Sequence, residues 1–356
     1  MRILIFHGYL LRGTGSNIYN AELVRTLAAL GHEVHLLCQD RHYEPPEGVT
    51  VYIPDIGRVL PVYVADEYEG FDAKPFPELT DAELEHYIGA NVEAVRAVPT
   101  PDVALANHLV MGPVILARAL AGRAPYAVKI HGSALEYTVR PHPERFLPYA
   151  LEGIRGANGV LVGSHHTAES LFEVLADEPS LRERTRLGPP GVDVHTFRRG
   201  QPDLELIASR PAAGWGGEQG TADILRTLDL SSDRIVSYVG KLIVSKGVDL
   251  LLAAWPLVID RVPEARLLVV GFGTYREALD GFVDALRRAD VEALREIATR
   301  GRELEGGPPG ELRYLNAFLE TVDETWLRAA PAARWTAGRT GRPLTQAPRR
   351  CAATRT

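Results

Sequence analysis

Two lysines lie close together in a short loop in the second half of the chain. A buried strand is expected to end at Gly240, Lys241 follows it, and Lys246 stands at the start of the next helix. Open α/β sheets bind ligands beyond the carboxyl ends of their strands, so both cations are expected at such an edge. The helix N-terminus adds unpaired N–H groups there. This arrangement suits a diphosphate leaving group, whose oxygens gain charge as its bond breaks. Two solvated surface lysines are the alternative.

A glycine-bearing loop follows the first expected strand. Gly13 and Gly15 flank Thr14, and glycines let a backbone approach a ligand closely. A turn with only a structural role is the alternative. The dinucleotide fingerprint G-x-G-x-x-G is absent, because Ile18 occupies the place of its third glycine, and this disfavours a dehydrogenase. No D-x-D sequence occurs either, and we therefore expect no metal ion.

Polar side chains stand at the ends of three further expected strands. His131, His108 and Ser164 each come soon after an apolar run in the first half of the chain. At the carboxyl edge of a sheet, each could contact a ligand. Histidines at strand ends also serve as structural groups, and capping of the next helix explains Ser164 equally well.

Alternating strand and helix patterns position these residues. Short apolar runs that end in loops indicate buried parallel strands, and apolar residues at helical spacing follow most of them. Strand, helix and strand with short connections form right-handed βαβ units, which predicts an α/β fold with a doubly wound sheet in the first half. The expected strands are 2–6, 33–38, 49–53, 102–106, 126–130 and 159–162, and the expected helices are 17–30, 81–98, 112–120, 143–155 and 167–175.

A second α/β unit is expected after a stretch rich in Pro, Gly and charge. Its expected strands are 235–239 and 265–270, and its expected helices are 248–262, 275–288, 291–304 and 311–327. The predicted parts of the chain are an N-terminal domain, a linker or insertion, a partial C-terminal domain and a tail, which span 1–197, 198–222, 223–326 and 327–356. The tail is rich in Arg and Ala and has no Asp or Glu, which a disordered basic segment or translation in a shifted frame would explain.

The sequence resembles the retaining glycosyltransferases of family 4. The resemblance rests on four segments, which are Gly13–Asn17, Lys129–Ser133, Gly188–Phe197 and Val239–Asp249. It covers nearly the whole chain before the tail. The resemblance implies the GT-B fold, in which two Rossmann-like domains face a cleft, and transfer of a sugar from a nucleoside diphosphate sugar.

The resemblance also implies roles for particular residues. Lys241 and Lys246 would bind the donor diphosphate, and Lys241 stands where Arg is common, so it keeps the charge but loses the bidentate fork. His131 would lie near the transferred sugar as the catalytic candidate. The remaining diphosphate candidates are Gly13, Gly15 and Gly240, and the other cleft candidates are Asn17, His108, Ser133, Ser164, Gly271 and Gly273.

One expected motif is missing. Members of the family carry a spaced pair of glutamates after a donor-domain strand, and no pair occurs in that context here. The second domain is therefore predicted to be incomplete, as if truncated or frameshifted. The apolar residues of the last expected helix, Leu312, Leu315, Phe318 and Leu319, are expected to lack packing partners, and we predict that the chain itself is inactive.

Composition limits the remaining choices. A chain of 356 residues with 46% hydrophobic and 24% charged residues is typical of a soluble two-domain enzyme, and its net charge of -7 disfavours nucleic acid as a partner. Cys38 and Cys351 can form neither a disulfide framework nor a zinc site, which favours the cytoplasm. The apolar runs are too short for a signal peptide or a membrane span, and peripheral membrane contact stays open.

We therefore predict a glycosyltransferase that moves a sugar from a nucleoside diphosphate sugar to an unidentified acceptor with retention, without cofactor or metal. A nucleotide-sugar epimerase of the same architecture and a non-catalytic truncated binding protein remain as alternatives.

Overall fold

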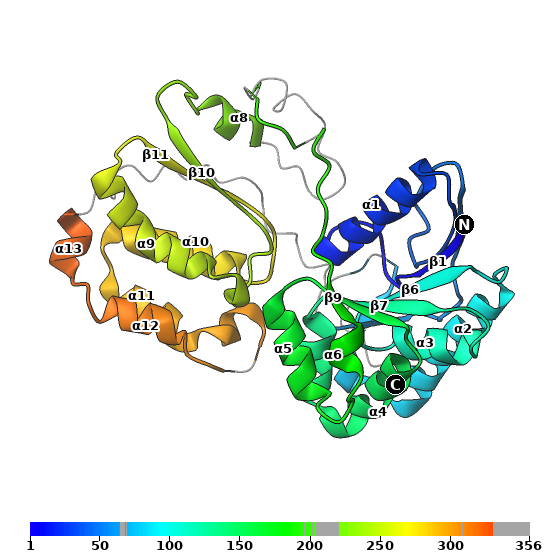
Figure 1. The fold of residues 1–356 in the computed structure, drawn as a ribbon. Helices are drawn as coiled ribbons and strands as arrows, with labels where there is room; N and C mark the ends of the chain where they lie inside the picture. The colour runs from blue at the N-terminus through cyan, green and yellow to red at the C-terminus, as the bar shows by residue number, and fades with distance from the viewer. Residues whose placement is uncertain are drawn as a thin grey trace, which may run out of the picture. The chain divides into compact units, whose positions relative to one another are not determined.

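The structure is a computed structural model, and it describes residues 1–64, 68, 70–195, 197–200, 203, 221–307 and 309–329. The chain divides into two compact units, Met1–Arg199 and Gly200–Thr356 (Figure 1). Each unit is described by itself. Most of the predicted linker and nearly all of the predicted tail lie outside the described residues.

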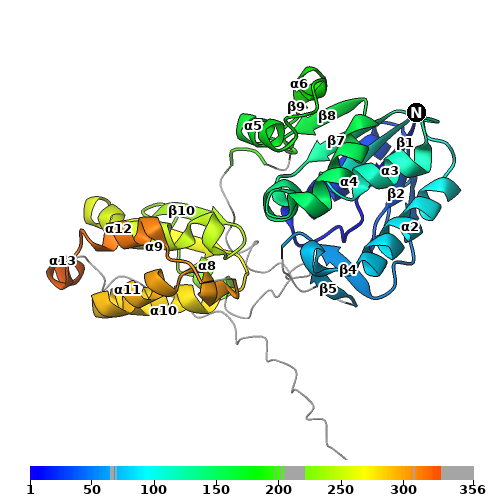
Figure 2. The ribbon, with the colours of Figure 1, turned by 90° about the horizontal axis from the view of Figure 1, so that it is seen from below.

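The first unit is built on a sheet of seven parallel strands. Their order is β3-β2-β1-β6-β7-β8-β9, so the sheet grows from β1 in both directions, as in a doubly wound fold. The strands are β1 (Arg2–Phe6), β2 (Glu33–Leu37), β3 (Val49–Tyr52), β6 (Val103–Asn107), β7 (Tyr126–Ile130), β8 (Gly159–Val162) and β9 (Thr185–Leu187). A separate pair, β4 (Val59–Val62) and β5 (Asp72–Pro75), forms a small sheet of its own (Figure 2).

Helices cover both faces of the large sheet. Figure 1 shows α1 on one side of the strands and α2, α3 and α4 on the other. The helices are α1 (Gly15–Ala29), α2 (Asp81–Ala97), α3 (Gly112–Leu120), α4 (Pro143–Arg155), α5 (His165–Val174) and α6 (Leu181–Arg184), with a 3-10 turn at Phe76–Glu78 and a π-helical segment at Leu135–Val139.

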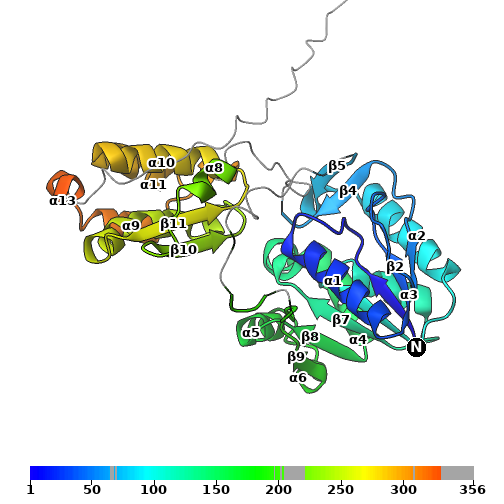
Figure 3. The same ribbon diagram turned by 90° about the horizontal axis from the view of Figure 1, so that it is seen from above.

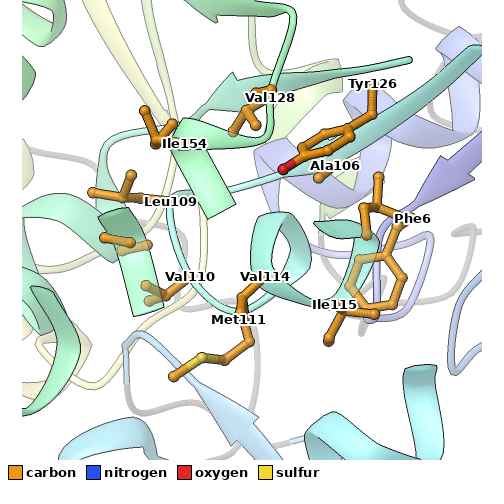
Figure 4. Close-up of a cluster of buried hydrophobic side chains, with 14 of the residues drawn as sticks. Phe6, Ala106, Leu109, Val110, Met111, Val114, Ile115, Tyr126, Val128 and Ile154 are labelled. Atoms are coloured by element: carbon orange, nitrogen blue, oxygen red, sulfur yellow. The ribbon is translucent and has the colours of Figure 1, made fainter. Parts of the chain in front are cut away.

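Alternate residues of β1 face opposite sides of the sheet and supply two cores. Ile3 and Ile5 pack in one cluster with Val24 of α1. Leu4 and Phe6 belong to the larger cluster on the other face, which includes the side chains of α3 shown in Figure 4. A strand that is apolar on both faces must be covered on both, which is why β1 lies in the middle of the sheet.

The second unit holds a small parallel sheet and a helical layer. β10 (Arg234–Val239) pairs in parallel with β11 (Ala265–Val270), and the two strands run side by side in Figure 3. In the part of this unit that the structure describes, no third strand joins them, and Val239 is 77% exposed. The helices are α8 (Thr221–Arg226), α9 (Val248–Arg261), α10 (Arg276–Arg288), α11 (Val291–Arg300), α12 (Arg313–Leu319) and α13 (Glu324–Ala329), with 3-10 turns at Val244–Lys246 and Arg302–Glu305.

The expectation that the last helical residues lack packing partners is wrong. Leu315 and Leu319 are each 1% exposed, Leu312 is 8% exposed, and Phe318 packs against the same cluster. They lie among residues of α9, α10 and α11, because α12 contacts both α9 and α11. Helices thus bury these side chains without a larger sheet.

The expected single helix 311–327 is two helices. It is interrupted between α12 and α13, where the Asp323 carboxylate accepts a hydrogen bond from the backbone N–H of Trp326 at 2.7 Å and so caps α13. The sequence patterns also missed β4, β5, β9, α6 and α8, which are short elements of three to six residues. Such lengths carry too little periodicity to be recognised.

One close contact between helices depends on a glycine. Gly153 of α4 lies against the start of α3, and a Cβ atom at this position would stand 2.5 Å from Cβ of Pro113 and 2.7 Å from the backbone nitrogen of Val114. Backbone atoms cannot move aside cheaply. The spacing of α3 and α4 therefore requires a residue without a side chain.

We predict that Gly153→Ala lowers the free energy of unfolding of the first unit by about 1–3 kcal/mol, the usual cost of overpacking. Chemical denaturation followed by circular dichroism measures this. Gly89→Ala is the matched control, because Gly89 is an exposed residue inside α2 with no atom within 4 Å of the added Cβ. It is expected to stabilise the helix by roughly 0.5–1 kcal/mol. Equal effects of the two substitutions would contradict the prediction.

Candidate functional site

Three histidines follow three neighbouring strands of the first unit. His7 comes directly after β1, His108 after β6 and His131 after β7. In the sheet β1 pairs with β6 and β6 pairs with β7, all in parallel, so the three carboxyl ends meet at one edge. The sheet grows in opposite directions on the two sides of β1, which makes this edge the topological switch point where doubly wound sheets bind ligands.

The three imidazole rings form one contiguous group. The ring centroids of His7 and His108 lie 6.5 Å apart, and those of His108 and His131 lie 4.9 Å apart. Tyr63 lies over His108 with 4.5 Å between centroids, and Tyr19 contacts His131 edge-on at 5.3 Å. Aromatic neighbours on several sides hold the rings in place.

Burial makes all three histidines difficult to charge. Desolvation lowers the pKa of His7 to about 4 and the pKa of His131 to about 3. The pKa of His108 is also lowered, first by burial and then by repulsion from His131 and His7. The three imidazole rings are therefore neutral near pH 7 and act as hydrogen-bonding groups rather than as charges.

Hydrogen bonds join two of these rings to asparagines. Nε2 of His7 lies 3.0 Å from the carbonyl oxygen of Leu10 and 3.0 Å from Oδ1 of Asn17. Nε2 of His131 lies 2.8 Å from Oδ1 of Asn107. Both ring nitrogens of His108 are buried, and neither has a hydrogen-bond partner within the described part of the chain. The candidates Asn17, His108 and His131 thus belong to one buried polar group.

The structure places the other first-unit candidates in different ways. Gly13 has a φ of +88° at the turn before α1, a conformation that favours glycine, and Gly15 is the first residue of α1 with open space where a Cβ would lie. Ser133 follows His131 and is partly exposed. Ser164 is the N-cap of α5, where its hydroxyl oxygen accepts a hydrogen bond from the backbone N–H of Thr167 at 3.1 Å.

The lysine loop of the second unit joins β10 to α9. Lys241 comes two residues after the end of β10, and Lys246 lies two residues before Val248, the first residue of α9. Gly247 lies between Lys246 and Val248, has a φ of +66° and serves as the N-cap of α9. Lys246 is exposed, whereas Lys241 is partly buried with its Nζ 5.9 Å from the ring centroid of Phe272. Both cations stand at the carboxyl end of the sheet, as the strand pattern predicts.

Backbone N–H groups of the lysine loop donate hydrogen bonds to neighbouring segments. The backbone N–H of Leu242 donates to the carbonyl oxygen of Phe272 at 2.7 Å, and that of Val244 donates to the Glu305 carboxylate at 2.8 Å. A Cβ at Gly271 would lie 1.9 Å from the carbonyl oxygen of Gly240, and one at Gly273 would lie 2.3 Å from that of Leu242. Gly271 and Gly273 therefore let the two loops pack backbone against backbone.

Sequence reasoning missed part of the first-unit group. His7, Asn20, Asn107 and Lys129 are all buried at this edge. The Lys129 ammonium donates to the carbonyl oxygen of Gly188, and burial lowers its pKa. A signal was present for His7, because it directly follows an apolar run, as His131 does, and His108 follows another after one residue.

The part of the chain that the structure describes contains no group of three His, Cys, Asp or Glu side chains arranged to hold a metal ion. The expected independence of metal stays a prediction. Within the same residues, no helix combines the length and the apolar character that crossing a membrane requires.

Solved structures define the class of fold. The chain is similar to Anabaena HepE in complex with UDP and glucose (15% identical, TM-score 0.50, 85% of this chain and 68% of that one). It is also similar to a UDP-forming trehalose-phosphate synthase from Burkholderia xenovorans (13% identical, TM-score 0.50, 80% and 68% of the two chains). The predicted α/β fold of the GT-B class is thereby confirmed.

Sequence comparisons identify the family. The model of the glycosyl transferase 4-like domain matches residues 14–191, half of the chain, and the chain belongs to this family. A D-inositol 3-phosphate glycosyltransferase from Frankia alni is 28% identical over 264 residues, and one from Xylanimonas cellulosilytica is 26% identical over 318 residues. The alignments cover 71% and 87% of this chain, but only 57% and 68% of the relatives. These transferase relatives do not favour the epimerase alternative.

We predict that the first unit loses stability as the pH falls from about 7 to about 4. An unfolded histidine binds a proton near pH 6.5, whereas buried His7 does so only near pH 4, so acid favours the unfolded state across this interval. The loss attributable to His7 is on the order of 1–3 kcal/mol. Hydrogen exchange of the β1, β6 and β7 amides at pH 7 and pH 5, corrected for intrinsic rates, measures it.

The control for this experiment separates His7 from other titrating groups. His7→Asn should flatten the pH dependence, whatever it does to overall stability. His166→Asn removes an exposed histidine of α5 and should leave the slope unchanged. An identical slope in the His7 variant and the unmodified chain would contradict the assignment.

Proposed function

We propose that the chain carries the binding elements of a glycosyltransferase that uses a nucleoside diphosphate sugar as donor and retains the configuration of the transferred carbon. The observation that carries the proposal is the lysine loop, which presents Lys241 and Lys246 beside the start of α9 at the carboxyl end of a parallel sheet. Membership of the glycosyl transferase 4-like family supports the reaction class.

The chemistry of this loop fits a diphosphate. Two ammonium groups lie in the loop at the N-terminal end of a 14-residue helix, where a helix favours negative charge, and the carboxylates of Glu305 and Asp249 lie there as well. As the bond to the sugar breaks, negative charge accumulates on the diphosphate oxygens, and groups already in position stabilise it without reorganisation. The hydrogen bonds that the loop backbone donates to the Phe272 carbonyl oxygen and to the Glu305 carboxylate keep the loop in this conformation before a ligand binds.

The first unit supplies a different kind of surface. Its switch-point edge is rich in neutral hydrogen-bonding groups, the three imidazoles and the asparagines beside them, which suit hydroxyl groups of a sugar or an acceptor. His131 is the catalytic candidate there, beside the loop at Gly13 and Gly15. We propose a polyhydroxylated acceptor, a class that includes the D-inositol 3-phosphate after which the relatives are named.

The sequence lacks the glutamate pair that the resemblance leads one to expect, and the described second sheet has two strands. We therefore propose that donor binding is retained while turnover by this chain is slow or absent. A transfer assay with labelled donor on the purified chain measures this directly, and turnover at ordinary enzyme rates, about 1 per second or faster, would contradict it.

We predict that the double substitution Lys241→Gln and Lys246→Gln weakens binding of uridine, guanosine or adenosine diphosphate at least tenfold, about 1.4 kcal/mol. Isothermal titration calorimetry with each of the three diphosphates measures it. Arg261→Gln removes one exposed charge from the far end of α9 and should leave the affinity unchanged. The proposal fails if the unmodified chain binds none of the three, or if the double variant binds as tightly as the unmodified chain.

A further inference from the structure

A chain of side-chain amides connects the buried histidines, and backbone carbonyl groups determine the orientation of each amide. A carbonyl oxygen can only accept hydrogen bonds, so whichever amide atom faces it must be the nitrogen. Nδ2 of Asn17 lies 2.7 Å from the carbonyl oxygen of Arg12, and Nδ2 of Asn20 lies 2.8 Å from that of Ser16. Nδ2 of Asn107 lies 3.1 Å from that of Phe6.

The orientation of Asn107 decides the protonation of His131. With Nδ2 committed to Phe6 and to Oδ1 of Asn20 at 2.9 Å, the Asn107 oxygen must face His131. That oxygen accepts from Nε2 of His131 at 2.8 Å, so Nε2 carries the proton. A neutral imidazole has one N–H group, and Nδ1 is then left with a lone pair.

The lone pair on Nδ1 of His131 is accessible. No residue that the structure describes hydrogen-bonds to this atom, and it is not among the buried polar atoms that lack a partner. The ring itself is held by contacts with Tyr19 and His108 at centroid distances of 5.3 and 4.9 Å. A fixed ring thus offers one hydrogen-bond acceptor of known direction at the switch-point edge.

We infer that Asn107 is a positioning residue, which holds His131 as the neutral Nε2–H tautomer so that its Nδ1 accepts a hydrogen bond from a hydroxyl group of a bound sugar. The part concerning a substrate hydroxyl rests on the proposed function. The tautomer itself does not, since it follows from contacts within the first unit alone.

The direct test of the tautomer is two-bond ¹H–¹⁵N correlation NMR of the full chain labelled in histidine. The His131 signals are assigned by their loss in His131→Gln. The inference expects Nε2 protonated and Nδ1 unprotonated in the unmodified chain. In Asn107→Ala both nitrogens should shift toward the averaged values of exchanging tautomers.

Asn91→Ala is the matched control. Asn91 is equally buried in the first unit, where its Nδ2 donates to the carbonyl oxygen of Tyr87 at 2.7 Å within α2. This variant should keep the unmodified His131 pattern. A proton on Nδ1 of His131 in the unmodified chain overturns the inference, even if Asn107→Ala does not fold. If Asn107→Ala folds and keeps the unmodified His131 pattern, the inference is also overturned.

Addition of uridine diphosphate glucose tests the role toward a hydroxyl group. A hydrogen bond accepted by Nδ1 moves its ¹⁵N resonance upfield, and the shift should be absent with uridine diphosphate alone. If calorimetry shows that the nucleotide sugar binds but Nδ1 does not move, the inference fails and the proposed function stands. If neither compound binds, the proposed function fails, and so does the part of the inference that concerns a substrate hydroxyl group. The tautomer of His131 is then tested by the spectra of the unliganded chain alone.

Discussion

Three imidazole rings can be buried side by side at the carboxyl edge of one sheet only if they carry no charge. Burial lowers the pKa of His7 and His131 to about 4 and 3, and a proton on any of the three rings would repel a proton on its neighbours. The surrounding asparagines are neutral as well, and the positive charge of the nearby Lys129 ammonium further disfavours a proton on His131. This constraint gives the first unit the character of a surface for hydroxyl groups, and it explains why the tautomer of each ring matters.

The second unit differs from the first, because it places two cations in one loop. Lys241 and Lys246 stand near the start of α9, and the loop that carries them packs through its backbone against Gly271 and Gly273. Side chains at those two glycines would push the loop away. The first unit thus offers neutral hydrogen-bonding groups, and the second unit offers a loop with two cations.

Much of the framework could be predicted from the sequence, because apolar runs and glycines mark the buried strands and their ends. The position of the lysine loop follows from that pattern alone. His108 and His131 were predicted as strand-end residues, but His7 was interpreted only as the start of a loop. The partners Asn20 and Asn107 are 87 residues apart and meet only in the folded sheet. The packing of α12 could not be predicted either, since the spacing of its apolar residues shows an apolar face but not which helices cover it.

The neutrality of the three histidines is tested most directly by following their ring C–H resonances with pH by NMR, with each signal assigned by substitution. The account predicts that the resonances of His7, His108 and His131 stay at their neutral positions from pH 8 to about pH 5, well below the value of about 6.5 for an unperturbed imidazole. Titration of any one of them near pH 6.5 in the folded chain would contradict it.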